Sequence, residues 1–119
     1  MLVKKVMVLL LLMGLGLGCS KSSSDSSAPA ITFEKAEGKS VNGQFTINGN
    51  INSSVSLLKV VLTKEGTATP FIVDDTTAKN KNSYAYSYLV TGITADTVIL
   101  IDVYNQNNVK TSSRYLIRF

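Results

Sequence analysis

Apolar and polar residues alternate in short runs along residues 31–119. In one run, Phe45 and Ile47 alternate with Thr46 and Asn48. Successive side chains of a β-strand point to opposite faces, so a period of two is typical of strands with one buried face. No stretch of this region repeats with the 3.6-residue period of a helix. The pattern therefore predicts an all-β fold.

Turn-forming residues divide this region into seven runs. We predict strands at about residues 31–37, 43–51, 56–64, 68–74, 83–91, 97–105 and 110–119. Pro70 has no N–H for a strand ladder, which places the fourth strand at a sheet edge. Asn107 and Asn108 tolerate positive φ and suit the last hairpin. Seven short strands with turns every ~8–12 residues are typical of an immunoglobulin-like sandwich of two sheets.

Two segments carry a family resemblance. Residues 90–103, VTGITADTVILIDV, resemble the corner between strands E and F of fibronectin type III and related bacterial immunoglobulin-like domains, where a Gly-Leu pair precedes a turn and an alternating strand. Residues 41–49, VNGQFTING, are similar to the second strand of such domains. Ile99 stands where those domains carry a corner tyrosine, and the chain has no tryptophan. The resemblance implies one seven-stranded immunoglobulin-like domain over residues 31–119.

The chain begins with a basic and then apolar segment. Lys4 and Lys5 precede a thirteen-residue run of apolar and small residues, 6–18. A helix needs about 20 apolar residues to cross a bilayer, whereas the core of a secretory signal peptide has about 7–15. We therefore predict a cleaved signal peptide over residues 1–18.

Residues 16–19, GLGC, resemble the lipobox of bacterial lipoproteins. Gly16 departs from the leucine that this pattern prefers. The resemblance implies an acylated Cys19, with membrane lipid as its partner and the bacterial cell envelope as its location. Ser20 after the cysteine is, by resemblance to enterobacterial lipoproteins, compatible with the outer membrane, facing either the periplasm or the outside. The alternative is an ordinary signal peptide that leaves a free thiol at Cys19.

A serine-rich segment follows the cysteine. Residues 20–30 contain six serines and no large apolar side chain. Such a composition cannot bury enough surface to offset the entropy lost on ordering. We predict that residues 19–30 form a lipidated cysteine and a disordered tether.

Catalytic chemistry has few candidates in this chain. It contains no histidine, and Cys19 is its single cysteine, which removes the common general base and nearly all zinc arrangements. We predict no catalytic residue, no metal and no cofactor. The net charge of +4 falls to +2 without Lys4 and Lys5, which argues against nucleic acid.

Two groups of side chains remain as candidates. Asp74 and Asp75 begin a loop, where turn formation and capping of backbone N–H groups is favoured over calcium binding. Tyr84, Tyr86 and Tyr88 share one strand face. They are interpreted as core residues, with a flat binding platform for a sugar or protein as the alternative.

Together these features predict a non-enzymatic, lipid-anchored envelope protein. Its immunoglobulin-like domain would serve as a binding or adhesion module for a protein or glycan. The alternative is a structural accessory subunit of an outer-membrane complex, docked by adding a strand at a free sheet edge. The strand pattern does not define an oligomeric state.

Overall fold

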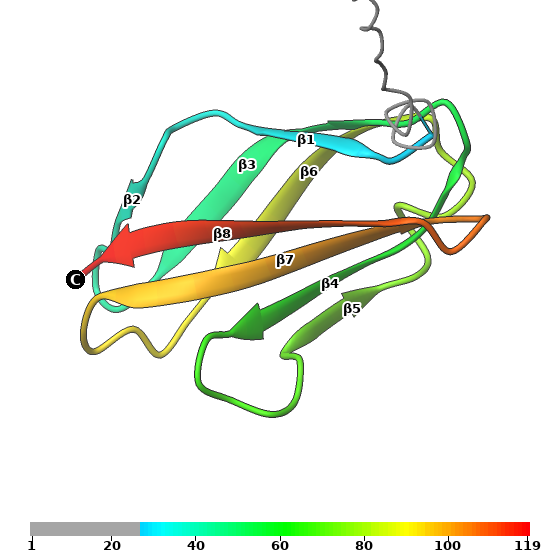
Figure 1. Ribbon diagram of the computed structural model, residues 1–119. Coiled ribbons are helices and arrows are strands. Elements are labelled where there is room, and N and C mark those ends of the chain that lie inside the picture. The colour runs from blue at the N-terminus through cyan, green and yellow to red at the C-terminus, as the bar shows by residue number, and fades with distance from the viewer. Residues whose placement is uncertain (1–26) are drawn as a thin grey trace, which may run out of the picture.

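The computed structural model describes residues 27–119, which form a two-layered β-sandwich (Figure 1). No helix occurs within this range, and the prediction of an all-β sandwich is confirmed. The predicted signal peptide, Cys19 and most of the tether lie outside the described residues. The strands are β1 (Ala30–Phe33), β2 (Gly38–Lys39), β3 (Phe45–Asn52), β4 (Leu57–Lys64), β5 (Ile72–Asp74), β6 (Ser83–Val90), β7 (Thr97–Asn105) and β8 (Lys110–Arg118).

The strands divide into a smaller and a larger sheet. The three-stranded sheet has the order β1-β3-β6, and the five-stranded sheet has the order β2-β8-β7-β4-β5. Neighbouring strands are antiparallel except β2 and β8, which run parallel. In Figure 1 the smaller sheet lies behind the larger one. The two inner faces enclose the core.

The prediction of one continuous strand over residues 31–37 is wrong, because β1 ends at Phe33 and β2 begins at Gly38. The chain pairs with β3 along β1, leaves that sheet in an exposed bend, and pairs with β8 along β2. The described residues therefore contain eight strands, because this segment switches from one sheet to the other. The predicted edge position of the fourth strand is confirmed, and β5 begins only after Pro70.

The folded region begins before the predicted boundary at residue 31. Pro29 is buried, and its carbonyl accepts a hydrogen bond of 2.6 Å from the Thr111 hydroxyl. The side-chain amide of Asn105 donates to the carbonyl of Ser27 at 2.8 Å. These two contacts attach the end of the serine-rich segment to β8 and β7, so the boundary shifts toward residue 27.

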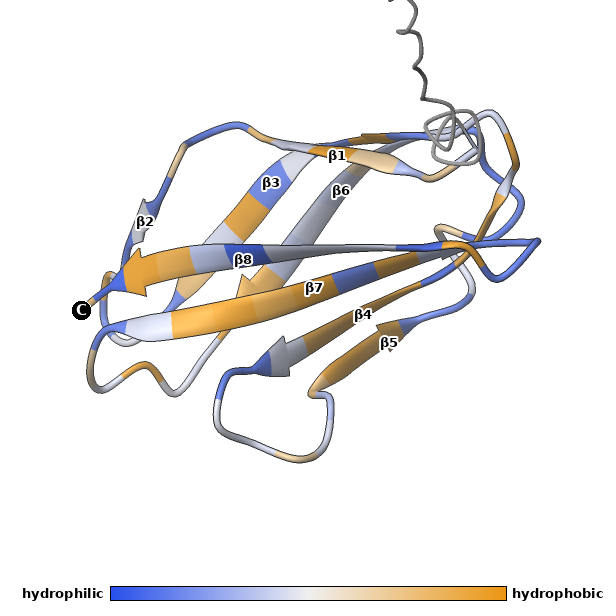
Figure 2. Cartoon of the chain, in the orientation of Figure 1, coloured by the Kyte–Doolittle hydropathy of each residue, from blue (hydrophilic) through white to orange (hydrophobic). Residues whose placement is uncertain are grey.

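Both sheets contribute apolar side chains to one core. Figure 2 shows the hydrophobic stretches along β3, β4, β7 and β8. Ile99, which the sequence resemblance places at the position of the corner tyrosine, is fully buried. At this corner the N–H of Ile93 donates to the carbonyl of Gly43 at 3.0 Å. Fully or almost fully buried aliphatic residues are Ile47, Ile51, Leu57, Val60, Leu62, Val90, Ile93, Ile99, Ile101, Val103 and Ile117.

Candidate functional site

The three tyrosines of β6 point into the sandwich. β6 pairs with β3 in one continuous antiparallel register. Tyr86 and Tyr88 are 2% and 7% exposed and stack with ring centroids 5.6 Å apart, while Tyr84 is half-buried. Their interpretation as core residues is confirmed for Tyr86 and Tyr88. The platform alternative is wrong for these two rings, because both side chains are buried.

Asp74 ties the tyrosine row to the opposite sheet. It ends β5 in the larger sheet, whereas the tyrosines lie on β6 in the smaller sheet. Its Oδ2 accepts hydrogen bonds from the hydroxyls of Tyr88 at 2.8 Å, Thr77 at 2.6 Å and Tyr84 at 3.2 Å. Residues ten and fourteen positions away thus converge on one carboxylate oxygen.

The other carboxylate oxygen organises the loop after β5. Oδ1 accepts from the N–H groups of Thr77 at 3.0 Å and Thr76 at 3.3 Å. The expected capping of loop N–H groups is confirmed for Asp74. Within residues 27–119 no group of three acidic, histidine or cysteine side chains is placed to hold a metal ion.

Hydrogen bonding keeps Asp74 ionised despite its burial. Burial alone would raise the pKa of Asp74, but the hydroxyls of Thr77 and Tyr88 and the loop N–H groups lower it to about 2. Burial, followed by the hydrogen bond to Asp74 and its charge, raises the pKa of Tyr88 well above its usual range. A charged acceptor therefore faces a neutral donor, which is the stronger kind of hydrogen bond.

This arrangement predicts a loss of stability in acid. A carboxylate with a lowered folded-state pKa stabilises the fold fully above its ordinary value of 3.8, and this contribution disappears as the pH falls through about 2. We expect urea denaturation to show a falling free energy of unfolding between about pH 4 and pH 2. Tyr88→Phe should flatten this slope, because one cause of the low pKa is removed.

Tyr104→Phe is the matched control for that measurement. Tyr104 lies on β7, and none of the hydrogen bonds to Asp74 involves it. Its variant should keep the wild-type slope. An unchanged slope in Tyr88→Phe would contradict the assigned role of the Tyr88 hydroxyl.

Gly49 allows Tyr86 to reach across β3. The two residues lie directly opposite each other, and the Tyr86 hydroxyl donates to the Thr32 carbonyl on β1 at 2.8 Å. A Cβ at Gly49 would overlap the Thr32 carbonyl oxygen and lie 2.5 Å from the Tyr86 hydroxyl oxygen. The glycine is thus required by close approach, a reason that the sequence pattern does not contain.

The outward side of the smaller sheet is a candidate binding surface. A shallow hollow of about 500 Å³ lies there, lined in part by Phe33, Glu34, Gly49 and Tyr86. We define the outer sheet face by the other five lining residues, which are Thr32, Asn48, Asn50, Ala85 and Ser87. These side chains are short and offer amide and hydroxyl groups but no nucleophile paired with a base. The face can form hydrogen bonds and has no catalytic constellation. Sequence reasoning missed it because single Asn and Ser residues on a strand carry no motif.

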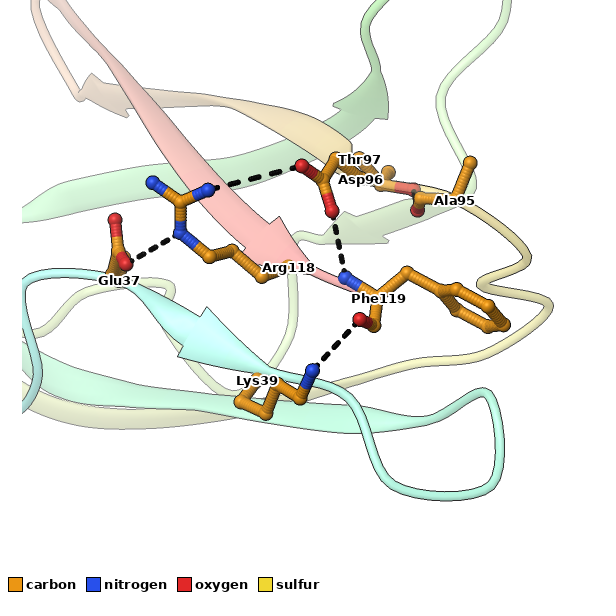
Figure 3. A network of polar contacts seen from close by, with 7 residues as sticks. All are labelled: Glu37, Lys39, Ala95, Asp96, Thr97, Arg118 and Phe119. Carbon is orange, nitrogen blue, oxygen red and sulfur yellow. Dashed lines mark hydrogen bonds and ion pairs between the residues drawn. The ribbon is translucent and has the colours of Figure 1, made fainter.

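A network of polar contacts holds β2 beside the end of β8, close to Phe119 (Figure 3). The Arg118 guanidinium contacts Glu37 at 2.7 Å and Asp96 at 3.9 Å. Lys39 donates to the carbonyl of Phe119 at 2.8 Å, and the N–H of Phe119 donates to Asp96 at 2.9 Å. The charged side chains are about half exposed, so each ion pair contributes only about 0–1 kcal/mol. We interpret this network as structural.

Comparisons with known proteins support the fold. No protein-family model matches the chain, and no curated protein matches it. Among solved structures, the chain is similar to the fibronectin(III)-like modules of CbhA from Clostridium thermocellum, at 14% identity and a TM-score of 0.56. The similarity covers 77% of this chain and 46% of that one. The fold is fibronectin(III)-like.

The similarity agrees with the resemblance seen in the sequence at the level of the fold. The sequence resemblance, carried by residues 41–49 and 90–103, covers most of residues 31–119, and the structural similarity covers 77% of this chain. In the part of the chain that the structure describes, no helix is long and apolar enough to cross a membrane.

Proposed function

We propose that this protein is a lipid-anchored component of the bacterial cell envelope that presents one non-catalytic binding module. The observation that carries the proposal is the segment GLGC at residues 16–19, directly after a basic and apolar leader. The sandwich supports it, because fibronectin(III)-like folds serve as modules and the described surface has no catalytic constellation.

The spacing between anchor and module is short. Seven residues separate Cys19 from Ser27, where the described domain begins. Eight peptide steps span at most about 28 Å when fully extended. The module therefore stays close to the membrane surface and meets ligands of the envelope itself.

We assign ligand binding to the outer sheet face. Its amides and hydroxyls, at Asn48, Asn50 and Ser87, complement a ligand rich in hydroxyl or amide groups, such as a glycan or an exposed protein backbone. The alternative role, as an accessory subunit of an outer-membrane complex, would use a sheet edge instead.

Substitution of Cys19 tests the anchor. We expect Cys19→Ser to abolish acylation, because serine lacks the thiol that forms the thioether, and to leave an uncleaved or unanchored protein. Electrophoretic mobility, labelling with a clickable fatty acid and membrane fractionation measure this result. Ser20→Ala is the matched control and should remain acylated. Retention of Cys19→Ser in the membrane fraction with unchanged mobility and label would refute the anchor.

A further inference from the structure

The two sheets have four edges, and one of them differs from the rest. The larger sheet ends in β2, with two residues, and in β5, with three residues that follow Pro70. The smaller sheet ends in β1, with four residues, and in β6, with eight. β6 is therefore the long edge of the described domain, and Figure 1 shows it at the border of its sheet.

The free backbone groups of β6 follow from its pairing with β3. The N–H of Ser53 donates to the carbonyl of Asn82 at 2.8 Å, which continues the β3–β6 register and fixes its phase. In an antiparallel ladder, every second residue exchanges both hydrogen bonds with its partner strand. On β6 these are Tyr84, Tyr86, Tyr88 and Val90.

The alternating residues present their backbone groups to the open edge. They are Ser83, Ala85, Ser87 and Leu89, and all four side chains are exposed. Within residues 27–119 none of their N–H or carbonyl groups has a hydrogen-bond partner. Four donors and four acceptors thus form a continuous row.

This edge lacks the features by which proteins prevent strand addition. Charged residues, prolines and bulges are the common protections. No charged residue or proline occurs from Asn82 to Ala95, and the β3–β6 register is continuous. By contrast, the register of the β4–β7 pair is interrupted by a bulge or irregularity between Leu57 and Lys59. An edge of this length and composition can therefore pair with another strand.

We propose that β6 pairs antiparallel with β6 of a second copy of this chain, which joins the two smaller sheets into one six-stranded sheet. The register that uses every free group places Ala85 opposite Ser87 of the second copy, and Ser83 opposite Leu89. A two-fold rotation that exchanges the two copies leaves this pairing unchanged. Two-fold symmetry is the symmetry of most homodimers. The pairing does not depend on the lipid anchor. It uses the backbone groups of Ala85 and Ser87, whose side chains belong to the outer sheet face.

The composition of β6 favours a second copy as the occupant. Pairing a strand with itself brings its own charges together, and β6 carries none. Its outward side chains include Ala and Ser, which leave room for a close neighbour, and the 51% exposed Leu89 gains cover. A single strand pair buries less than the roughly 1,200 Å² of a standard interface, so we expect a reversible dimer.

Cysteine cross-linking in the full-length chain tests the pairing. Ala85→Cys places a thiol on the paired edge, where the two copies are diagonal neighbours about 7–8 Å apart. The matched control is Asn50→Cys, because Asn50 is exposed and lies directly opposite Ala85 on β3. Three strand spacings of about 4.8 Å, combined with the same two-residue offset along the strand of about 6.8 Å, then separate the two control residues by about 16 Å. Wild type, which carries Cys19 alone, defines the background.

Treatment of whole cells with a short bis-maleimide should give at least about tenfold more dimer for Ala85→Cys than for Asn50→Cys, because only the former lies within cross-linking reach. Adding Ser87→Lys to Ala85→Cys should remove the dimer, since a lysine protects the edge. Adding Asn48→Lys, opposite Ser87 on β3, should not. Protease resistance of each variant verifies its folding.

Three results would overturn the proposal. The first is equal cross-linking at residues 85 and 50. The second is a protease-resistant Ala85→Cys protein that forms no dimer. The third is cross-linking of Ala85→Cys to a different protein only, which would favour the accessory-subunit role.

Discussion

Gly49→Ala is expected to lower the free energy of unfolding by about 3–4 kcal/mol, from overpacking and loss of one hydrogen bond. The added Cβ would overlap the Thr32 carbonyl oxygen and displace the Tyr86 hydroxyl that bonds to it. At an ordinary strand position the same change reduces the entropy of the unfolded chain and stabilises by about 0.4–1 kcal/mol. The close packing around Gly49 therefore reverses the sign of the effect.

Urea denaturation followed by circular dichroism measures this change. Asn50→Ala is the matched control, because Asn50 is the next residue of β3 and its side chain is exposed. It should alter the free energy of unfolding by no more than about 0.5 kcal/mol. A Gly49→Ala protein as stable as wild type would show that β3 and Tyr86 separate easily, contrary to the packing described above.

Asp74→Ala is expected to lower the free energy of unfolding by about 3–5 kcal/mol, because it leaves the buried Tyr88 hydroxyl and several partly buried donors without an acceptor. The Tyr88 hydroxyl is buried and donates to Asp74 alone among the described contacts. The hydroxyl and N–H of Thr77 lose the same acceptor. Since Asp74 joins β5 to β6, the loss also loosens the contact between the two sheets.

Two further variants sharpen this test. Asp74→Asn keeps one carbonyl oxygen for the loop N–H groups and should cost less than Asp74→Ala. Asp75→Ala removes the exposed neighbouring carboxylate and should change the free energy of unfolding by no more than about 0.5 kcal/mol. Equal effects of Asp74→Ala and Asp75→Ala would refute the role assigned to Asp74.

These variants separate stability from function. Gly49, Asp74 and Tyr88 act within the sandwich, so their substitution should reduce the amount of folded protein without changing acylation. Cys19 acts through the anchor and lies outside the described domain. The β6 edge is independent of both, because its free groups point away from the core.

Local pattern was sufficient for much of the fold. Alternation in runs such as residues 43–51 identified strands because side-chain direction along a strand has a period of two. The edge position of the strand after Pro70 followed from a missing N–H, and the capping by Asp74 followed from the chemistry of a short acidic side chain before a loop. Each of these inferences depends on neighbouring residues only.

Pairing between distant residues decided the rest. The pattern of β6 showed that its tyrosines share a face, but burial of that face depends on β3 and on the opposing sheet. Likewise, the sequence pattern predicted one strand over residues 31–37. In the structure the chain pairs first with β3, along β1, and then with β8, along β2.

Strand periodicity, most strand positions and the candidate anchor at Cys19 could be inferred from the order of the residues alone. The tertiary structure alone decided which sheet each strand joins, why residue 49 is glycine, and which edge stays open. A period of two defines two faces of a strand, but it assigns neither face and neither edge to a partner.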